Sequence, residues 1–453
     1  MMFTLVCNGI LIDPIQDRVI HNCGILLDNN GTIIDVGTND EMRSKAFKLT
    51  EETKTIHLKF LDLKGRVIMP GLVCAHHHFY SSFARGLLLK DYSAKNFYDI
   101  LDQLWWKLDK LLSSEEIYYS AVAALIDCLR NGVTTVIDHH ESQGVQKGSL
   151  QQIAKAVKTI GLRASLCLGV SDRFGKGDEG IQATEEFINE TLLDSTNNYN
   201  ILPMIGLHAS FTVNDLTLNK ISKLKEKYKL GIHTHCAEDE LDEHNCIEKY
   251  NCRVVERFDK FGLLDDKTIL AHCVHINEDE MKLIAERKSN IVLNPESNMN
   301  NAVGCANLLK MLQYGINVGL GTDAMSSHMI LQARSLCLIQ RHHFKNPNIA
   351  FVESANTLLK ANVKIVEILF GKKFNTFSAG IPLDAVVYNY IPPTPITNNN
   401  YYGHLLYGIA YATVDTVYVN GKQLLSEGKV INFSEKDLLN EVRKIAERFW
   451  EKF

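Results

Sequence analysis

The chain has 453 residues, of which 45% are hydrophobic and 22% are charged. These fractions are typical of a globular protein and exclude a disordered or fibrous chain. The net charge is −5 and no block of Lys or Arg occurs, so the composition argues against a nucleic acid or an anionic membrane as partner. We therefore expect a small-molecule partner.

Two further counts bear on where the protein works. No apolar run reaches the roughly 20 residues that a membrane span needs. The eleven cysteines are scattered and include no Cys-x-x-Cys pair, which does not fit a disulfide framework. We therefore expect a cytoplasmic protein without a membrane-spanning segment.

The N-terminal segment, residues 1–66, predicts short strands. Turn signals at Asn8-Gly9 and Asn29-Asn30-Gly31 divide it into β-prone runs. The runs are Thr4–Cys7, Ile10–Asp13, Gly24–Leu27 and Thr32–Val36. Because these few strands can bury little apolar surface by themselves, we expect them to pair with strands from elsewhere in the chain.

From Val67 the pattern changes to short apolar runs, each followed by a helical stretch. The runs are Val67–Leu72, Thr134–Ile137, Arg163–Leu168, Ile201–Leu207, Leu230–His233, Thr268–Ala271, Asn290–Leu293 and Asn317–Leu320. Alternation of strands and helices predicts a parallel α/β protein, and eight units predict a TIM (β/α)8 barrel over residues 67–373. Asn277 and Glu280 have the spacing of a capping box, which favours a helix that begins there.

Strands return after the barrel. Residues 374–433 contain β-prone runs at Asp384–Tyr390 and Thr416–Val419. We expect these to join residues 1–66 in one small β-sandwich domain formed from both termini. Residues 434–453 predict a C-terminal helix.

Histidine is the most informative residue type, because many of the 17 lie close together at the ends of predicted strands. His76 and His78 follow the first barrel strand, His235 the fifth and His272 the sixth, and Asp323 ends the eighth. The chemistry of a TIM barrel is located at these strand ends. Alternation along a strand points His76 and His78 to the same side. Several imidazoles with a carboxylate suit Zn²⁺ or Fe²⁺ better than Ca²⁺ or Mg²⁺.

Three stretches, PGLVCAHHHFYSSFARG, NPESNMNNAVG and YNYIPPTPITNNNYYGHLL, resemble the amidohydrolase superfamily. The sequence is similar to its mononuclear branch of guanine deaminase, S-adenosylhomocysteine deaminase and triazine hydrolases, and within that branch to the SsnA group of aminohydrolases. The resemblance runs from about Gly9 to Gly428. It implies one divalent ion, Zn²⁺ in preference to Fe²⁺, and a homo-oligomer.

The resemblance also implies roles for individual residues. The implied metal ligands are His76, His78, His235 and Asp323. Glu238 matches a proton-shuttling glutamate, and His272 matches a histidine that contacts the attacking water or the substrate. Binuclear members carry a carboxylated lysine after the fourth strand, but Ile205–Phe211 contains no lysine. One metal ion is therefore expected.

The expected activity is that of a hydrolytic deaminase which releases ammonia from a purine, pterin or triazine ring. Asp323 would take a proton from metal-bound water, and the resulting hydroxide would attack the carbon that carries the amine. His272 would stabilise the developing charge, while Glu238 would protonate the adjacent ring nitrogen and then the amine.

Two alternatives remain open at this point. The same centre could hydrolyse a cyclic amide or another C–N or C–Cl bond. The chain could also be a non-catalytic metal-binding protein associated with selenium metabolism, but Glu238 and His272 argue against this, since a structural site has no use for a proton shuttle.

Three more residues are candidate substrate contacts. Asp109 matches an acidic residue that contacts the sugar of the substrate in some relatives, although a solvated carboxylate on a helix is the simpler interpretation. His140 and His208 lie at the ends of the second and fourth predicted strands, where a structural role is an equal alternative.

Neighbouring residues have structural interpretations. His233 and His275, each beside a ligand-bearing position, are expected to support the ligands or to pack, and not to bind metal. Trp105 and Trp106 precede Asp109 on one predicted helix. We expect the two indoles to pack within that helix and not to stack on a substrate.

Overall fold

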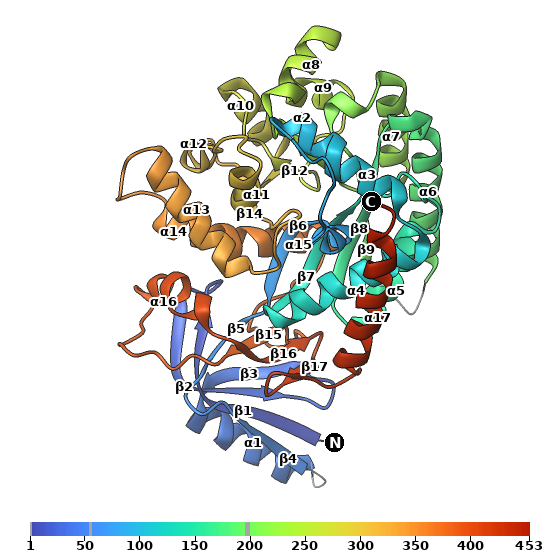
Figure 1. The fold of residues 1–453 in the computed structure, drawn as a ribbon. Coiled ribbons are helices and arrows are strands. Elements are labelled where there is room, and N and C mark those ends of the chain that lie inside the picture. Colours follow the sequence, from blue (N-terminus) through green and yellow to red (C-terminus); the bar gives the residue numbers. More distant parts are fainter. Residues whose placement is uncertain (1, 54–56, 195–199) are drawn as a thin grey trace.

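The computed structural model describes residues 2–53, 57–194 and 200–453, and its centre is a parallel barrel (Figure 1). The barrel strands are β6 (Leu72–His77), β7 (Val133–His140), β8 (Arg163–Val170), β10 (Ile205–Leu207), β11 (Ile232–Cys236), β12 (Ile269–His272), β13 (Asn290–Leu293) and β14 (Asn317–Leu320). Neighbours in this order are hydrogen-bonded, and a short strand, β9 (Ile201–Pro203), adds to β8. The predicted (β/α)8 barrel is confirmed.

The first and last barrel strands meet just beyond the end of β14. The N–H groups of Thr322 and Asp323 donate to the carbonyl of His76, at 2.9 and 3.2 Å. His77 and Asp323 form an isolated parallel bridge. This closure brings the metal-type residues of strand one next to the carboxylate that follows strand eight.

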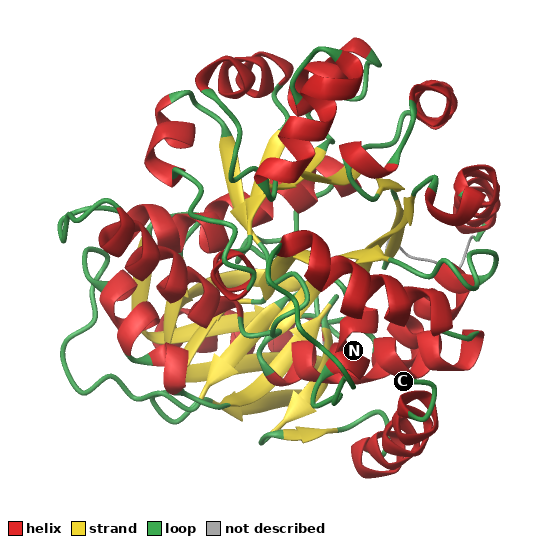
Figure 2. Cartoon of the chain, turned by 45° about the horizontal axis from the view of Figure 1, so that its top comes forward, coloured by secondary structure: helices red, strands yellow, loops and turns green. Residues whose placement is uncertain are grey.

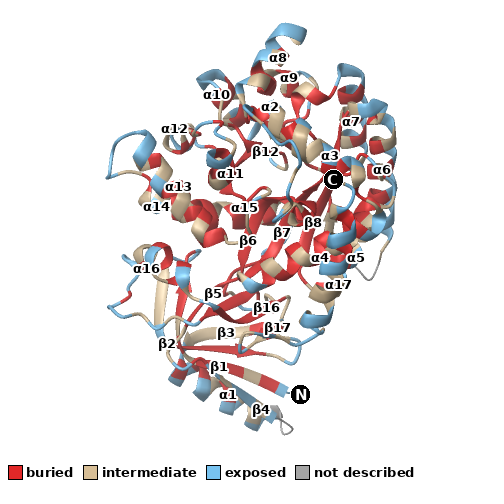
Figure 3. Ribbon diagram, in the orientation of Figure 1, coloured by how far each residue is buried: buried red, intermediate tan, exposed pale blue. Residues whose placement is uncertain are grey.

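Helices surround the barrel strands (Figure 2). They include α4 (Ser114–Arg130), α5 (Ser149–Ile160), α6 (Gly177–Leu193), α7 (Asp215–Tyr228), α8 (Glu240–Tyr250), α9 (Val254–Lys260), α10 (Glu278–Arg287), α12 (Leu308–Gln313) and α13 (Met329–His343). Helix α10 begins at the predicted capping box, where Glu280 N–H donates to the Asn277 side chain and Asn277 N–H to the Glu280 carboxylate. Most of these helices are buried on the side that faces the barrel and exposed on the outer side (Figure 3).

A second, mixed sheet combines the two ends of the chain. It contains β1 (Met2–Asp13), β2 (Arg18–Leu27), β3 (Ile33–Thr38), β4 (His57–Asp62), β5 (Val67–Pro70), β15 (Ala385–Tyr388), β16 (Val414–Val419), β17 (Lys422–Ser426) and β18 (Lys429–Val430). The two ends meet where β5 pairs antiparallel with β15. Helix α1 (Asn39–Thr53), which the sequence did not predict, packs against β1 and β2.

The predicted first barrel strand, Val67–Leu72, is wrong in one respect. It is split between β5 of the mixed sheet and β6 of the barrel, with Gly71 at the junction. A Cβ atom at Gly71 would lie 2.3 Å from Thr134 Cγ2, so only glycine lets the chain cross so close to β7. Similarly, Thr4–Cys7 and Ile10–Asp13 form one strand, β1, with a bulge near Gly9.

Two contacts fix the barrel against its surroundings. Arg163 at the start of β8 forms a fully buried ion pair with Asp384 before β15, with Nη1 and Oδ2 2.9 Å apart. The C-terminal helix α17 (Glu435–Trp450) lies beside α4, and the Trp450 indole donates to the Phe83 carbonyl at 2.7 Å. Among the described residues, no helix combines the length and the apolar character that a membrane crossing requires.

Candidate metal and catalytic site

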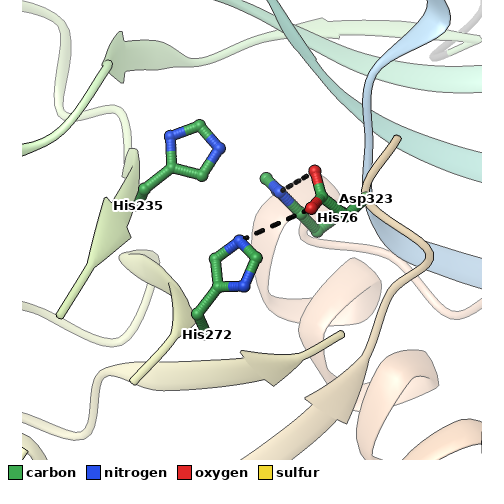
Figure 4. A group of neighbouring side chains, drawn as sticks. All are labelled: His76, His235, His272 and Asp323. Carbon is green, nitrogen blue, oxygen red and sulfur yellow. Dashed lines mark ion pairs between the residues drawn. The ribbon is translucent and has the colours of Figure 1, made fainter. Parts of the chain in front are cut away.

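Four strand ends place metal-type side chains around one point (Figure 4). His76 comes from β6, His235 from β11 and His272 from β12, and Asp323 follows β14. One ligand atom of each of these residues lies within 4.8 Å of those of the others. His78 belongs to the same cluster, since its Nε2 is 2.8 Å from Asp323 Oδ1 and 3.1 Å from His235 Nε2.

The backbone turns sharply where these side chains emerge. Ala237, His272 and Asp323 have φ values of 45°, 74° and 52°. This left-handed conformation is uncommon for residues other than glycine, costs about 1–3 kcal/mol and is concentrated at functional sites. Two of these three residues, His272 and Asp323, are ones that the sequence predicted to carry the chemistry.

Hydrogen bonds orient the predicted histidine ligands. His76 Nδ1 lies 2.8 Å from His233 Nε2, and His235 Nδ1 lies 2.7 Å from the His208 carbonyl. His78 Nδ1 is likewise 2.5 Å from the His139 carbonyl. A proton on each Nδ1 leaves the Nε2 lone pair free, which is the arrangement found in metal-binding histidines. His233 thus supports a ligand, as predicted.

The donor set fits a divalent cation. Burial lowers the pKa of His76 to about 3 and that of His235 to well below its ordinary value, so both imidazoles are neutral as metal ligation requires. His76 Nε2 is buried and has no hydrogen-bond partner among the described residues. Burial opposes ionisation of Asp323, but the imidazoles of His76 and His78 beside it hold the pKa of its carboxyl well below 3.8.

Glu238 lies at the edge of the cluster, where its carboxyl group contacts His272 and Asn301. Its Oε2 is 3.6 Å from His272 Nε2, and its Oε1 accepts a hydrogen bond from Asn301 at 3.2 Å. Burial and the nearby negative charge of Asp323 raise the pKa of Glu238 well above 4.5. A carboxyl group whose pKa is raised keeps its proton to a higher pH and is better suited to deliver it to a substrate atom.

His272 differs from the other histidines in its hydrogen bonds. The side-chain amide of Asn298 lies 2.9 Å from His272 Nδ1. With Nδ1 as acceptor, the proton of the neutral ring is on Nε2, which faces Asp323 Oδ2 at 4.0 Å. In this tautomer the Nε2–H group of His272 lies toward Glu238 and Asp323, at 3.6 and 4.0 Å, and Nε2 does not offer a lone pair to a metal.

The structure adds residues that the sequence did not single out. Ser297 and Asn298 lie on the short helix α11 (Pro295–Asn300), and the Ser297 hydroxyl donates to Asp323 Oδ2. The polar run after the seventh strand was the available signal. Asp242 in α8 accepts from the N–H groups of Ala237 and Phe211, both at 3.0 Å, and so holds the turn that carries Glu238.

A cavity opens beside the cluster, with about 760 Å³ of empty space that includes the solvent at its opening. Two predicted substrate contacts, Asp109 and His208, line it, whereas His140 is buried and is not among the lining residues. The interpretation of Asp109 as a solvated carboxylate is wrong, since it is 1% exposed. Trp105 and Trp106 pack in their helical segment as expected, but they also line the cavity, because this segment covers its mouth.

Comparison with known proteins identifies the family. The profile of the amidohydrolase family matches residues 67–424. A 5-methylthioadenosine/S-adenosylhomocysteine deaminase of Halothermothrix orenii is 30% identical over 94% of this chain and 99% of its own length. A 5'-deoxyadenosine deaminase of Methanocaldococcus jannaschii is 29% identical over 86% of this chain and 90% of its own.

A solved structure agrees with these relatives in fold. The adenosine deaminase of Xanthomonas campestris with bound zinc superposes with a TM-score of 0.84 at 20% identity, covering 98% of both chains. At this level of identity the likeness concerns the fold. The match of the family profile to residues 67–424, together with the 30% identical relative, shows that the chain belongs to the amidohydrolase family.

Proposed function

We propose that the chain is a metal-dependent hydrolytic deaminase that releases ammonia from an aminated heterocycle. The observation that carries this proposal is the position of the Glu238 carboxyl, which lines the cavity beside the histidine cluster and lies 3.6 Å from His272 Nε2. Relatives that are named deaminases support it.

The proposed metal ligands are His76, His78, His235 and Asp323. We propose zinc as the ion, which is also present in the adenosine deaminase structure. A divalent ion at this place lowers the pKa of water from about 15.7 to about 7 and thereby supplies the nucleophile at neutral pH.

The residues of the chain account for the remaining proton movements. Asp323 accepts the proton that the attacking water loses, and His272 Nε2–H stabilises the charge that develops at the attacked carbon's oxygen. Glu238 gives its proton to the ring nitrogen next to that carbon, and this nitrogen takes up the electron pair of the C=N bond as the carbon is attacked. The hydroxyl group that has added to the carbon then loses its proton through the same carboxyl to the amine, which leaves as ammonia while the C=O bond forms. The proton held by Asp323 returns to Glu238 and restores the starting state.

The proposed substrate class is an aminopurine, since the named relatives act on adenosine derivatives. The cavity is suited to a planar ring, because aromatic side chains line it and can stack on the ring. These side chains are Tyr80, Phe97, Trp105, Trp106 and Phe211. We also propose the cytoplasm as compartment, since all eleven cysteines are free; the homo-oligomer stays a prediction.

Ammonia release tests the proposal directly. The purified protein, loaded with zinc and with its metal content measured, is assayed against aminopurines, aminopterins and aminotriazines in a coupled ammonia assay. We expect at least one aminopurine to give one ammonia per ring, loss of activity on chelation, and recovery when zinc is added back. If the protein binds one equivalent of zinc and every ring remains intact, the proposed function is wrong.

A further inference from the structure

The carboxyl groups around the cavity outnumber the positive charges. Six acidic residues line it, and none of the described lining residues is Lys or Arg. The six are Asp109, Glu141, Glu238, Asp239, Asp242 and Asp323. A divalent ion at the histidine cluster would offset only part of this charge. Burial raises the pKa of Asp109 to about 6, that of Asp242 to about 7 and that of Glu141 to about 8, so these carboxyls lack enough positive charge nearby to keep their pKa values in the usual range.

Arg173 carries the guanidinium that lies beside this wall, and its donors are already hydrogen-bonded to described residues. Arg173 Nη1 donates to Asp109 Oδ2 and Nη2 donates to Glu141 Oε2, both at 2.8 Å. Its Nε donates to Ser171 Oγ at 3.0 Å, and its side chain is 8% exposed. Arg173 therefore holds the two carboxylates in place and has little capacity left to bind an anion.

In each of these two carboxyl groups, the second oxygen accepts no hydrogen bond from the described residues. Asp109 Oδ1 and Glu141 Oε1 are buried and have no hydrogen-bond partner among the described residues. Their residues are 1% and 2% exposed and both line the cavity. Gly169 makes room for one of them, since a Cβ at this position would lie 1.7 Å from Glu141 Oε1. Buried acceptors without a partner are costly and indicate a missing donor.

Aromatic rings also line the cavity, and one of them, Trp106, already has the Arg173 guanidinium over its ring, 5.1 Å from the centroid. Phe97, Trp105 and Trp106 line it together with Asp109. Aromatic faces attract cations, and the attraction is stronger where water is excluded. Carboxylate oxygens and aromatic faces together are a suitable environment for an ammonium group, whereas a carboxylate or phosphate would meet like charges.

We propose that the cavity selects a heterocyclic amine whose substituent carries a positive charge, held as an alkylammonium group by Asp109 and Glu141, and rejects an anionic substituent. The inference rests on the proposed function, because it names the substrate class of the same site.

Three adenine derivatives with chains of equal length test this selection: 9-(3-aminopropyl)adenine, 9-(3-hydroxypropyl)adenine and 3-(adenin-9-yl)propanoate. Binding to the zinc-loaded Glu238→Gln protein is measured by calorimetry, and ammonia release is measured with the wild type. We expect the ammonium compound to bind at least ~30-fold more tightly than the carboxylate, the effect of placing like charges together at a buried site, with the hydroxyl compound between them.

Asp109→Asn tests which residue is responsible. It removes one carboxylate and frees Arg173, so the preference for ammonium over carboxylate is expected to fall by about tenfold or more. Binding of the hydroxyl compound shows that the variant is folded. Asp279→Asn, on a side chain that is 78% exposed in α10, is the matched control and is expected to keep the wild-type preference.

The outcomes separate this inference from the proposed function. Equal binding of the ammonium and carboxylate compounds, or an unchanged preference in Asp109→Asn, overturns the charge selection even if ammonia is released. Preferential binding of the ammonium compound without ammonia release supports the charge selection and counts against the deaminase. Weaker binding of the ammonium compound than of the hydroxyl compound also overturns the inference.

Discussion

The affinity for zinc is expected to depend on His233, which lies outside the proposed ligand set. His76 Nδ1 is 2.8 Å from His233 Nε2, and both rings are fully buried. His233→Phe leaves the N–H group of His76 without an acceptor where water does not reach, at a cost of about 1–3 kcal/mol. Loss of such an outer partner weakens metal binding by ~10- to 100-fold, or ~1.4–2.8 kcal/mol. The two ranges overlap, so we expect the Kd for zinc to rise by ~10- to 100-fold.

Competition with a chromophoric chelator measures this Kd. His233→Gln keeps an acceptor oxygen and is expected to recover much of the lost affinity. His275→Phe is the matched control, because His275 lies 2.7 Å from the Val303 carbonyl and has no hydrogen bond to a proposed ligand. If His233→Phe is folded by circular dichroism and binds zinc as tightly as the wild type, the hydrogen bond does not orient His76.

Three other substitutions test the remaining parts of the site. Glu238→Gln keeps the size of the side chain but cannot carry a proton, so kcat is expected to fall by ~10²- to 10⁴-fold with zinc content unchanged; a loss below ~10-fold contradicts the proton-transfer role. Burial raises the pKa of Asp242 from 3.8 to about 7, so the stability that its neutral form contributes in the folded protein is full below pH 3.8 and is lost as the pH rises toward 7. Urea unfolding is expected to show the wild type losing stability relative to Asp242→Asn between about pH 4 and pH 7, and a constant difference refutes this linkage. Gly169→Ala places a Cβ 1.7 Å from Glu141 Oε1 and 2.7 Å from His139 Cε1, and such crowding is expected to cost about 1–3 kcal/mol of unfolding free energy; wild-type stability would mean that the neighbouring side chains move at no cost.

Local patterns were sufficient to predict the barrel and its chemistry. Short apolar runs followed by helical stretches identify βα units, because side chains repeat with a period of two in strands and 3.6 in helices. The spacing of His76 and His78 therefore predicts that both face the same side. The carboxyl ends of the strands meet at one rim of a barrel, so His235, His272 and Asp323 could be assigned to the same place as these two.

Contacts between distant segments could not be predicted in the same way. β5 belongs to the mixed sheet and not to the barrel because it pairs with β15, near the other end of the chain. The residues of a strand do not indicate which distant strand it will pair with. Asp242 holds the turn before Glu238, yet in the sequence it is one acidic residue among several in the first turn of a helix.

The sequence by itself determined the barrel and the placement of the metal-type residues at its strand ends, and its resemblance to a family predicted roles for Glu238 and His272. Only the tertiary structure decided the burial and the charge of the side chains around the site. Asp109 is an ordinary helix residue in the sequence, but burial beside Arg173 makes it part of a charged cavity wall. Burial and charge depend on what surrounds a side chain, and those neighbours come from strands and helices that are far apart along the chain.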